Sequence, residues 1–268
     1  MRVSDPALDP AEALRLLAAT LREAGAIALT IFQTPVKSWL KDQSSPVSEA
    51  DIAVDNFLRQ RLVRAGFGWL SEESEDDRSR HGASRLWIVD PIDGTRSYLA
   101  GRPDWVISVA LVAGGRPVLA ALFAPVSDEL FLAAAGAGAT RNGAPIGVSV
   151  GARLDGSKVA GPKRLVQALA ALAPRLTMTP RIGSLALRLA RVAQGELDLA
   201  FASGSSHDWD LAGADLLVHE AGGAMTNLVG RTLTYNQPEL VHGSLVAAGA
   251  ERHAALIEIA RDRPAEFA

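Results

Sequence analysis

Cysteine is absent from the 268 residues of the chain, which excludes disulfide bonds, thiolate metal ligands and a cysteine nucleophile. A strong charge of either sign is also missing, because 27 basic residues face 30 acidic ones and leave a formal net charge of −3. So balanced a chain gives no reason to expect a nucleic-acid polymer or an anionic membrane as a partner. An anionic ligand would have to be attracted by a local site.

Long apolar runs are missing as well. None reaches the ~18 residues that a membrane-spanning helix needs. The first ten residues include Asp5 and Asp9 and have no basic stretch followed by an apolar one, so they do not resemble a signal peptide. Together with the lack of cysteine, these features predict a soluble cytoplasmic protein.

Apolar residues make up 48% of the chain, and their spacing predicts both helices and strands. Helical spacing covers residues 11–32, 162–172, 184–194, 210–220 and 250–261, and a capping box at Ser48 begins one more helix. Apolar runs predict strands at 66–70, 86–89, 129–134, 197–201 and 244–248, and a hairpin of 106–113 with 117–124. We expect an α+β half, residues 1–145, and an α/β half, residues 146–268, in one structural unit with the active site between the halves.

The richest segment for chemistry is Asp90-Pro91-Ile92-Asp93-Gly94-Thr95, where the predicted buried strand should stop at Asp90-Pro91. Two close carboxylates repel each other, and a bound Mg²⁺ would remove that cost because it prefers oxygen ligands. The N–H groups of Gly94 and Thr95 could then meet a phosphate. The alternative is an ordinary turn, since Asp, Pro and Gly are common turn residues.

Other carboxylates could join this pair. Glu72 or Glu73 follows the predicted strand at 66–70, and Asp51 and Asp210 lie at predicted helix starts. For the acidic tract around Glu72 the alternative is a solvated loop. For Asp51 and Asp210 the alternative is simple N-terminal capping.

Three segments in this order resemble the inositol monophosphatase superfamily: Ser71-Glu72-Glu73-Ser74, the run from Trp87 to Thr95, and Trp209-Asp210-Leu211-Ala212-Gly213. The resemblance extends from Ser45 to Gly223. It implies an α+β fold, layered as an α/β/α/β/α sandwich, and a Mg²⁺-dependent phosphomonoesterase that holds two or three ions. It also implies a small phosphorylated substrate, a homodimer and inhibition by lithium.

The resemblance also implies a role for each matching residue. Metal ligands would be Glu72, Asp90, the carbonyl of Ile92, Asp93 and Asp210. Asp51 and Thr95, with Glu72, would orient and activate the attacking water. Substrate-binding residues would be Asp93, Gly94, Thr95, Gly183, Ser184, Leu185, Ser203 and Asp210.

The sequence says less about which ester is cleaved. Ser203 lies where inositol-specific members carry an acid, which argues against an inositol substrate. Segments such as Tyr235-Asn236-Gln237-Pro238 are more similar to bacterial 3'(2'),5'-bisphosphate nucleotidases, so we favour a nucleotide such as adenosine 3',5'-bisphosphate. Inositol 1-phosphate and histidinol phosphate are the alternatives. Arg96, Arg181 and Lys158 could meet a second phosphate or could simply be solvated surface residues.

Two further alternatives remain. Haloacid-dehalogenase-type phosphatases carry an Asp-x-Asp-Gly-Thr motif with one residue between the two aspartates. Here two residues separate Asp90 from Asp93, so the spacing does not match that motif. A regulatory binding protein of the same fold is the non-enzyme alternative. Because every acid that a catalyst would need is present, we favour the enzyme.

Overall fold

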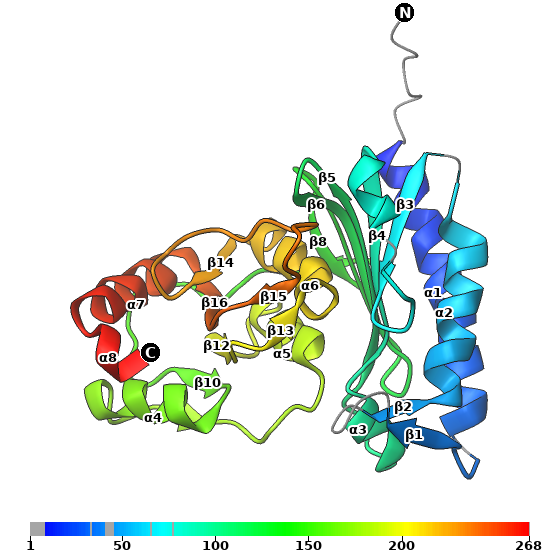
Figure 1. The fold of residues 1–268 in the computed structure, drawn as a ribbon. Coiled ribbons are helices and arrows are strands. Elements are labelled where there is room, and N and C mark those ends of the chain that lie inside the picture. Colours follow the sequence, from blue (N-terminus) through cyan, green and yellow to red (C-terminus); the bar gives the residue numbers. More distant parts are fainter. Residues whose placement is uncertain (1–8, 33, 41–45, 65, 77, 268) are drawn as a thin grey trace, which may run out of the picture.

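The computed structural model describes residues 9–32, 34–40, 46–64, 66–76 and 78–267. Two sheets and three groups of helices alternate in five layers (Figure 1). This arrangement confirms the expected α/β/α/β/α sandwich. Within these residues no helix is both long and apolar enough to cross a membrane.

The larger sheet has seven strands in the order β3-β4-β5-β6-β7-β8-β9. Only the β3–β4 pair is parallel, and each later pair is antiparallel. The strands are β3 Phe67–Ser71, β4 Arg85–Asp93, β5 Val106–Ala113, β6 Arg116–Ala124, β7 Glu129–Ala134, β8 Gly138–Arg141 and β9 Ala144–Pro145. The predicted hairpin is confirmed as β5–β6, and Gly114 and Gly115 in its turn both have the positive φ that glycine tolerates best.

The smaller sheet has five strands in the order β11-β10-β12-β16-β14. Its members are β10 Lys158–Ala160, β11 Thr177–Met178, β12 Leu199–Ala202, β14 Gly223–Asn227 and β16 Leu245–Gly249. Two short antiparallel pairs complete the strands: β1 Ser38–Leu40 with β2 Pro46–Ser48, and β13 Ser206–His207 with β15 Val241–His242.

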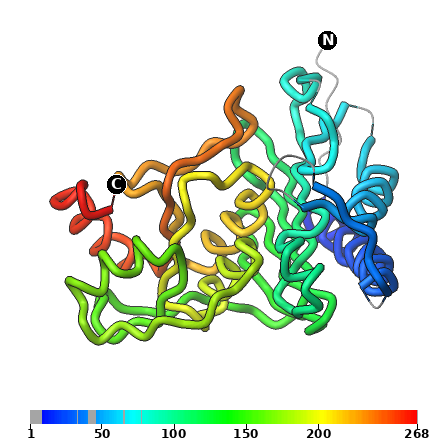
Figure 2. The backbone as a smooth tube through the Cα atoms, turned by 60° about the horizontal axis from the view of Figure 1, so that its bottom comes forward, coloured from blue at the N-terminus to red at the C-terminus, as the bar shows by residue number. Residues whose placement is uncertain are grey.

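Helices cover both sheets and fill the space between them (Figures 1 and 2). The outer helices on the large sheet are α1 Pro10–Phe32 and α2 Glu49–Leu62, and those on the small sheet are α4 Lys163–Leu172 and α7 Ala250–Asp262. The middle layer holds α5 Leu185–Ala193 and α6 Asp208–Glu220. The short helices are η1 Ser79–Gly82, α3 Thr95–Leu99 and α8 Pro264–Phe267.

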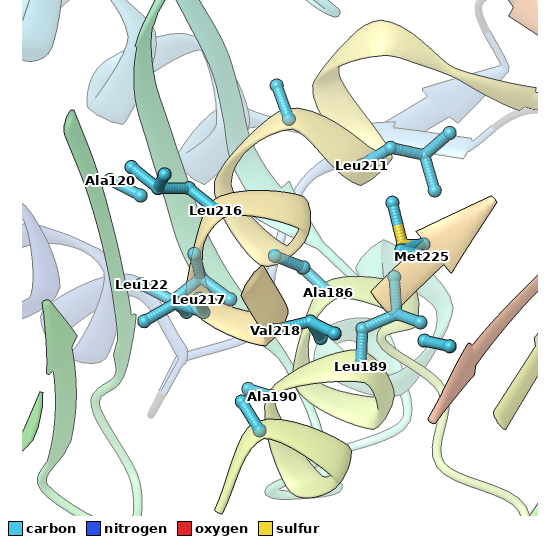
Figure 3. Close-up of a cluster of buried hydrophobic side chains, with 14 of the residues drawn as sticks. Ala120, Leu122, Ala186, Leu189, Ala190, Leu211, Leu216, Leu217, Val218 and Met225 are labelled. Atoms are coloured by element: carbon cyan, nitrogen blue, oxygen red, sulfur yellow. The ribbon is translucent and has the colours of Figure 1, made fainter. Parts of the chain in front are cut away.

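The central core lies where α5 and α6 meet both sheets. Figure 3 shows Leu122 of β6, Leu189 of α5, Leu217 of α6 and Met225 of β14 converging there, and all four are buried. Gly213 allows α6 to approach the large sheet this closely. A Cβ at Gly213 would come within 2.7 Å of Leu122 Cδ1 and 3.0 Å of Ser108 Oγ. The helix that carries Asp210 is therefore packed closely against β5 and β6.

One expectation about β4 is wrong. The strand does not stop at Asp90-Pro91 but continues to Asp93, with a register shift between Asp90 and Asp93. Asp90 pairs with Ser108 and Asp93 with Val106, so β4 carries one residue more than β5 across this step. Proline lacks an N–H to donate, and a bulge lets the ladder resume beyond it.

Candidate metal centre and active site

Glu72 and Asp90 are brought together by the parallel pairing of β3 and β4. Carboxyl ends of parallel neighbours meet at the same edge of a sheet, and Glu72 follows the end of β3 directly. Its backbone N–H donates to the Val89 carbonyl at 3.2 Å, which fixes Glu72 beside the start of the bulge. Two positions that are 18 apart in sequence thus become neighbours.

Asp210 arrives from α6 to complete an acidic cluster. One carboxylate oxygen each from Asp90, Asp93 and Asp210 lies within 4.8 Å of the other two. Asp90 and Asp93 are buried, with 1% and 6% of their surfaces exposed. The cluster faces a cavity of about 190 Å³ that is also lined by Pro46, Glu72, Ile92, Gly94, Thr95, Arg96, Ser97, Arg102, Arg181 and Gly183.

The cluster has the electrostatics of a cation site. Burial raises the pKa of Asp90 well above its usual range, and the charges of Glu72, Asp93 and Asp210 raise it further. Burial, with the charge of Asp93, raises the pKa of Asp210 to about 7. Such carboxylates are costly to ionise together without a counter-charge. Three or four hard oxygen ligands around a small cavity fit Mg²⁺, which these residues could hold.

Asp93 is held in place by the beginning of α5. Ser184 Oγ donates to Asp93 Oδ2 at 2.6 Å, the Leu185 N–H to Oδ1 at 3.2 Å and the Ala186 N–H to Oδ2 at 2.5 Å. These N–H groups have no acceptor within their own helix. Of the predicted substrate contacts, Gly183 lines the cavity that the acidic cluster faces, Ser184 is fully buried against Asp93, and Leu185 lines a neighbouring cavity.

Asp51 reaches the cavity through Thr95. Ser48 caps α2, and its N–H and Oγ donate to Asp51 Oδ2 at 2.8 and 2.6 Å. The Thr95 hydroxyl lies 3.3 Å from Asp51 Oδ1 and 3.1 Å from the Ile92 carbonyl oxygen. Burial raises the pKa of Asp51 to about 6. The structure thus pairs a weakly acidic carboxyl with a hydroxyl at the cavity wall.

Asp104 is a residue of the site that the sequence did not reveal. Its side chain accepts the Gly183 N–H at 2.5 Å, and its carbonyl accepts the Ser184 N–H at 3.1 Å. A Cβ at Gly94 would lie 3.1 Å from the Asp104 carbonyl oxygen, in a backbone with φ of 101° that only glycine adopts readily. Asp104 therefore ties the loop before α5 to the end of β4. No local pattern marks this residue, since both partners are distant in sequence.

A second and larger cavity adjoins the first. It has a volume of about 520 Å³ and includes Ser203, the position that weakened the expectation of an inositol substrate. Arg181 lines both cavities, and Arg96 lines the cavity that the acidic cluster faces. Lys158 lines neither, and its backbone N–H donates to Asp198 at 2.7 Å.

Comparison with known proteins places this geometry in context. A family model described as "Inositol monophosphatase family" matches residues 9–265. An inositol-1-monophosphatase of Rhizobium meliloti is 36% identical over 203 residues, 71% of this chain and 75% of that protein. A 3'(2'),5'-bisphosphate nucleotidase CysQ of Haemophilus influenzae is 29% identical over 81% of this chain and 86% of that protein. The crystal structure of the extragenic suppressor protein suhB of Bartonella henselae superposes with a TM-score of 0.79, at 27% identity, covering 92% of this chain and 97% of that one.

Proposed function

Because the chain belongs to the inositol monophosphatase family, whose members hydrolyse phosphomonoesters, we propose that its acidic cluster is the catalytic centre of a Mg²⁺-dependent phosphatase. The convergence of Asp90, Asp93 and Asp210 within 4.8 Å, with Glu72 lining the same cavity, is the observation that carries the proposal. The ligands would be these four carboxylates and the Ile92 carbonyl, for two or three ions. When bound, Mg²⁺ supplies Lewis acidity toward phosphoryl oxygens and toward water.

The residues around the cluster position the reactants. Thr95 Oγ1 can donate to Asp51 Oδ1, which leaves its lone pairs to accept a proton from a water in the cavity. Since the pKa of Asp51 is about 6, its carboxylate is ionised and able to accept at neutral pH. The N–H groups of Gly94 and Thr95 would meet the phosphate, whose developing negative charge needs donors.

For the substrate we propose a 3'(2'),5'-bisphosphate nucleotide, with inositol 1-phosphate and histidinol phosphate as alternatives. Ser203 supports this choice, because the large cavity has no carboxylate at that position to bind a ring hydroxyl. We further propose a cytoplasmic, lithium-sensitive homodimer. Within each chain, the two halves would be residues 1–145 and 146–268. The cavity of the acidic cluster takes Glu72 and Asp90 from the first half and Gly183 and Asp210 from the second.

The metal assignment is tested by Asp90→Asn, which keeps the shape of the side chain and removes its charge. We expect phosphatase activity at saturating Mg²⁺ to fall by more than about 100-fold. Mutating a residue that only hydrogen-bonds a metal ligand already lowers metal affinity or activity by about 10–100-fold, and Asp90 would be a ligand itself. The variant should fold, since it removes a buried charge that its neighbours repel. Near wild-type activity in Asp90→Asn would refute the assignment.

The substrate choice is tested by kcat/KM values for adenosine 3',5'-bisphosphate, inositol 1-phosphate and histidinol phosphate at one Mg²⁺ concentration. We expect the first to be cleaved most efficiently. A strong preference for inositol 1-phosphate would overturn the choice without touching the metal assignment. Failure on every phosphomonoester, with the protein folded, would instead favour the regulatory alternative.

A further inference from the structure

The larger cavity is positively charged, although the chain as a whole is slightly acidic. Among the described residues its lining includes Lys163, Arg181 and Arg188 and no aspartate or glutamate. The remaining lining residues are Ala160, Gly161, Pro162, Thr179, Pro180, Ile182, Leu185 and Ser203. Three cations around a cavity of about 520 Å³, with no acid among the lining residues that the structure describes, form a local field that attracts anions.

Arg188 is the lining residue with an unused hydrogen-bond donor and no contacting anion among the described residues. It lies on α5, and its Nε is buried without a hydrogen-bond partner in the part of the chain that the structure describes. Its Nη1 donates to the Phe201 carbonyl at 3.0 Å, and no ion pair joins its guanidinium to a carboxylate of the described residues, although the charge of Asp93 acts on it from beyond contact distance. Arginine keeps its charge in proteins, and a desolvated cation without a contacting anion is costly. An anion in the cavity would offset that cost.

The helix α4 adds to the same field. Gly161, Pro162 and Lys163 lie at its beginning and line the cavity, and the N-cap residue Pro162 makes no side-chain capping hydrogen bond. The N-terminal N–H groups of a ten-residue helix have no acceptors of their own and carry its positive partial charge. Lys163 adds a full charge at the same end. Backbone and side chains from α4 and α5 therefore favour the same kind of ligand.

We propose that the larger cavity binds a second phosphate of the substrate, the one that is not hydrolysed. This inference rests on the proposed function, since it assumes that the ester phosphate lies at the carboxylate cluster. Arg181 lines both cavities, so one small molecule with two phosphates can occupy them together. Arg188, Lys163 and Arg181 would then determine specificity by selecting bisphosphorylated alcohols over monophosphorylated ones.

The anion site is tested first without catalysis. Isothermal titration with inorganic phosphate is carried out on the full chain in EDTA, so that no metal ion recruits phosphate to the carboxylates. We expect one phosphate ion to bind, and Arg188→Met to raise its dissociation constant by about 10–100-fold. That range corresponds to the loss of a hydrogen bond to a charged group. Arg164→Met is the matched control, because Arg164 follows Lys163 on α4, is exposed and does not line the cavity.

Lys163→Met keeps this test decisive if Arg188→Met does not fold, because Lys163 is exposed and its loss leaves the core untouched. Phosphate affinity should fall in Lys163→Met and stay within error in Arg164→Met. An absence of phosphate binding in wild type, or equal affinity in all three variants, would overturn the inference. That result would leave the metal centre and its chemistry unaffected.

The link to the substrate is tested by the ratio of kcat/KM for adenosine 3',5'-bisphosphate to that for adenosine 3'-monophosphate. We expect this ratio to exceed one in wild type and to fall by about 10–100-fold in Arg188→Met. Arg188→Lys should restore part of the preference because it restores the charge. If phosphate binds but the ratio is unchanged in Arg188→Met, the site serves a free anion and not the substrate, which contradicts the proposal. If neither nucleotide is cleaved, the choice of nucleotide fails and the titration alone decides the anion site.

Discussion

Asp51 and Asp210 hold the same position in two different helices. Each is the third residue after the N-cap, and each accepts the backbone N–H of its cap residue, Ser48 in α2 and His207 in α6. The capping interpretation of these acids is therefore confirmed. It does not exclude a second role, because Asp51 also meets Thr95 and Asp210 also joins the acidic cluster. A local pattern could predict that one carboxylate oxygen of each aspartate caps its helix. It could not reveal which distant residues the second carboxylate oxygen meets.

Ser184 is a residue whose predicted role can be separated from its observed contacts. The resemblance implies a substrate contact, whereas the structure shows its hydroxyl buried against Asp93 and capping α5. We expect Ser184→Ala to raise the Mg²⁺ concentration for half-maximal activity by about 10–100-fold. Loss of the cap should lower the free energy of unfolding by about 1 kcal/mol.

Steady-state kinetics at varied Mg²⁺ distinguish the two roles of Ser184. A positioning role predicts that KM for substrate is near wild type once Mg²⁺ is saturating. If instead KM rises several-fold at saturating Mg²⁺ and the metal dependence is unchanged, Ser184 acts on the substrate and the positioning role is wrong.

At the scale of elements, the long helices and the hairpin could be predicted because their apolar periodicity is local. The short strands β1, β2, β8, β9, β10, β11, β13, β14 and β15 were not predicted, and they are defined mainly by their pairing partners. The continuation of β4 past Pro91 belongs to the same class. Its last residue pairs with Val106, which no local pattern near Asp93 reveals. The bulge that places two acids of the cluster on one strand is thus a property of the sheet.

The close packing of α6 on the large sheet yields a second prediction. In Gly213→Ala the added Cβ would clash with Leu122 and Ser108, so we expect a loss of about 1–3 kcal/mol in the free energy of unfolding. Because α6 carries Asp210, activity should fall further than the loss of folded protein explains. Chemical denaturation and kcat at saturating Mg²⁺ measure the two effects.

Gly243→Ala is the matched control, since a Cβ there would meet nothing within 4 Å and its φ is not positive. It should leave both stability and activity close to wild type. A Gly213→Ala protein as stable and active as Gly243→Ala would show that the approach of α6 does not hold Asp210 in place.

For the whole molecule, the buried acids predict how stability depends on pH and metal. An aspartate titrates near 3.8 in the unfolded chain, whereas the pKa of Asp210 is about 7 in the folded protein without metal. Between these values the folded state binds more protons, so the free energy of unfolding falls as pH rises from about 4 to 7. We expect the melting temperature in EDTA to decrease from pH 5 to pH 7.5.

Mg²⁺ should reverse this trend, because a bound cation stabilises the ionised carboxylates. The rise in melting temperature on adding Mg²⁺ should therefore be larger at pH 7.5 than at pH 5. Asp90→Asn should show a smaller rise at both values. A melting temperature in EDTA that increases across this range, or an equal Mg²⁺ effect at both pH values, would contradict a shared site of buried acids.

The convergence of the acids is also a property of the whole fold. Glu72, Asp90 and Asp93 come together through the parallel β3–β4 pair and its bulge, and Asp210 joins them because α6 lies across the large sheet. Residue chemistry could nominate these acids only beside ordinary turn, loop and capping roles, and the resemblance of their motifs favoured the metal site over those roles. It could not reveal the larger cavity, whose cations come from α4, α5 and the loop before α5.

The claim that the acidic cluster binds divalent cations is tested most directly by anomalous diffraction from crystals soaked in Mn²⁺. This ion binds the same oxygen ligands as Mg²⁺. Peaks are expected at about 2.0–2.3 Å from carboxylate oxygens of Asp90, Asp93, Asp210 and Glu72. Well-diffracting crystals with ordered Mn²⁺ only elsewhere, or with none at these side chains, would contradict the account.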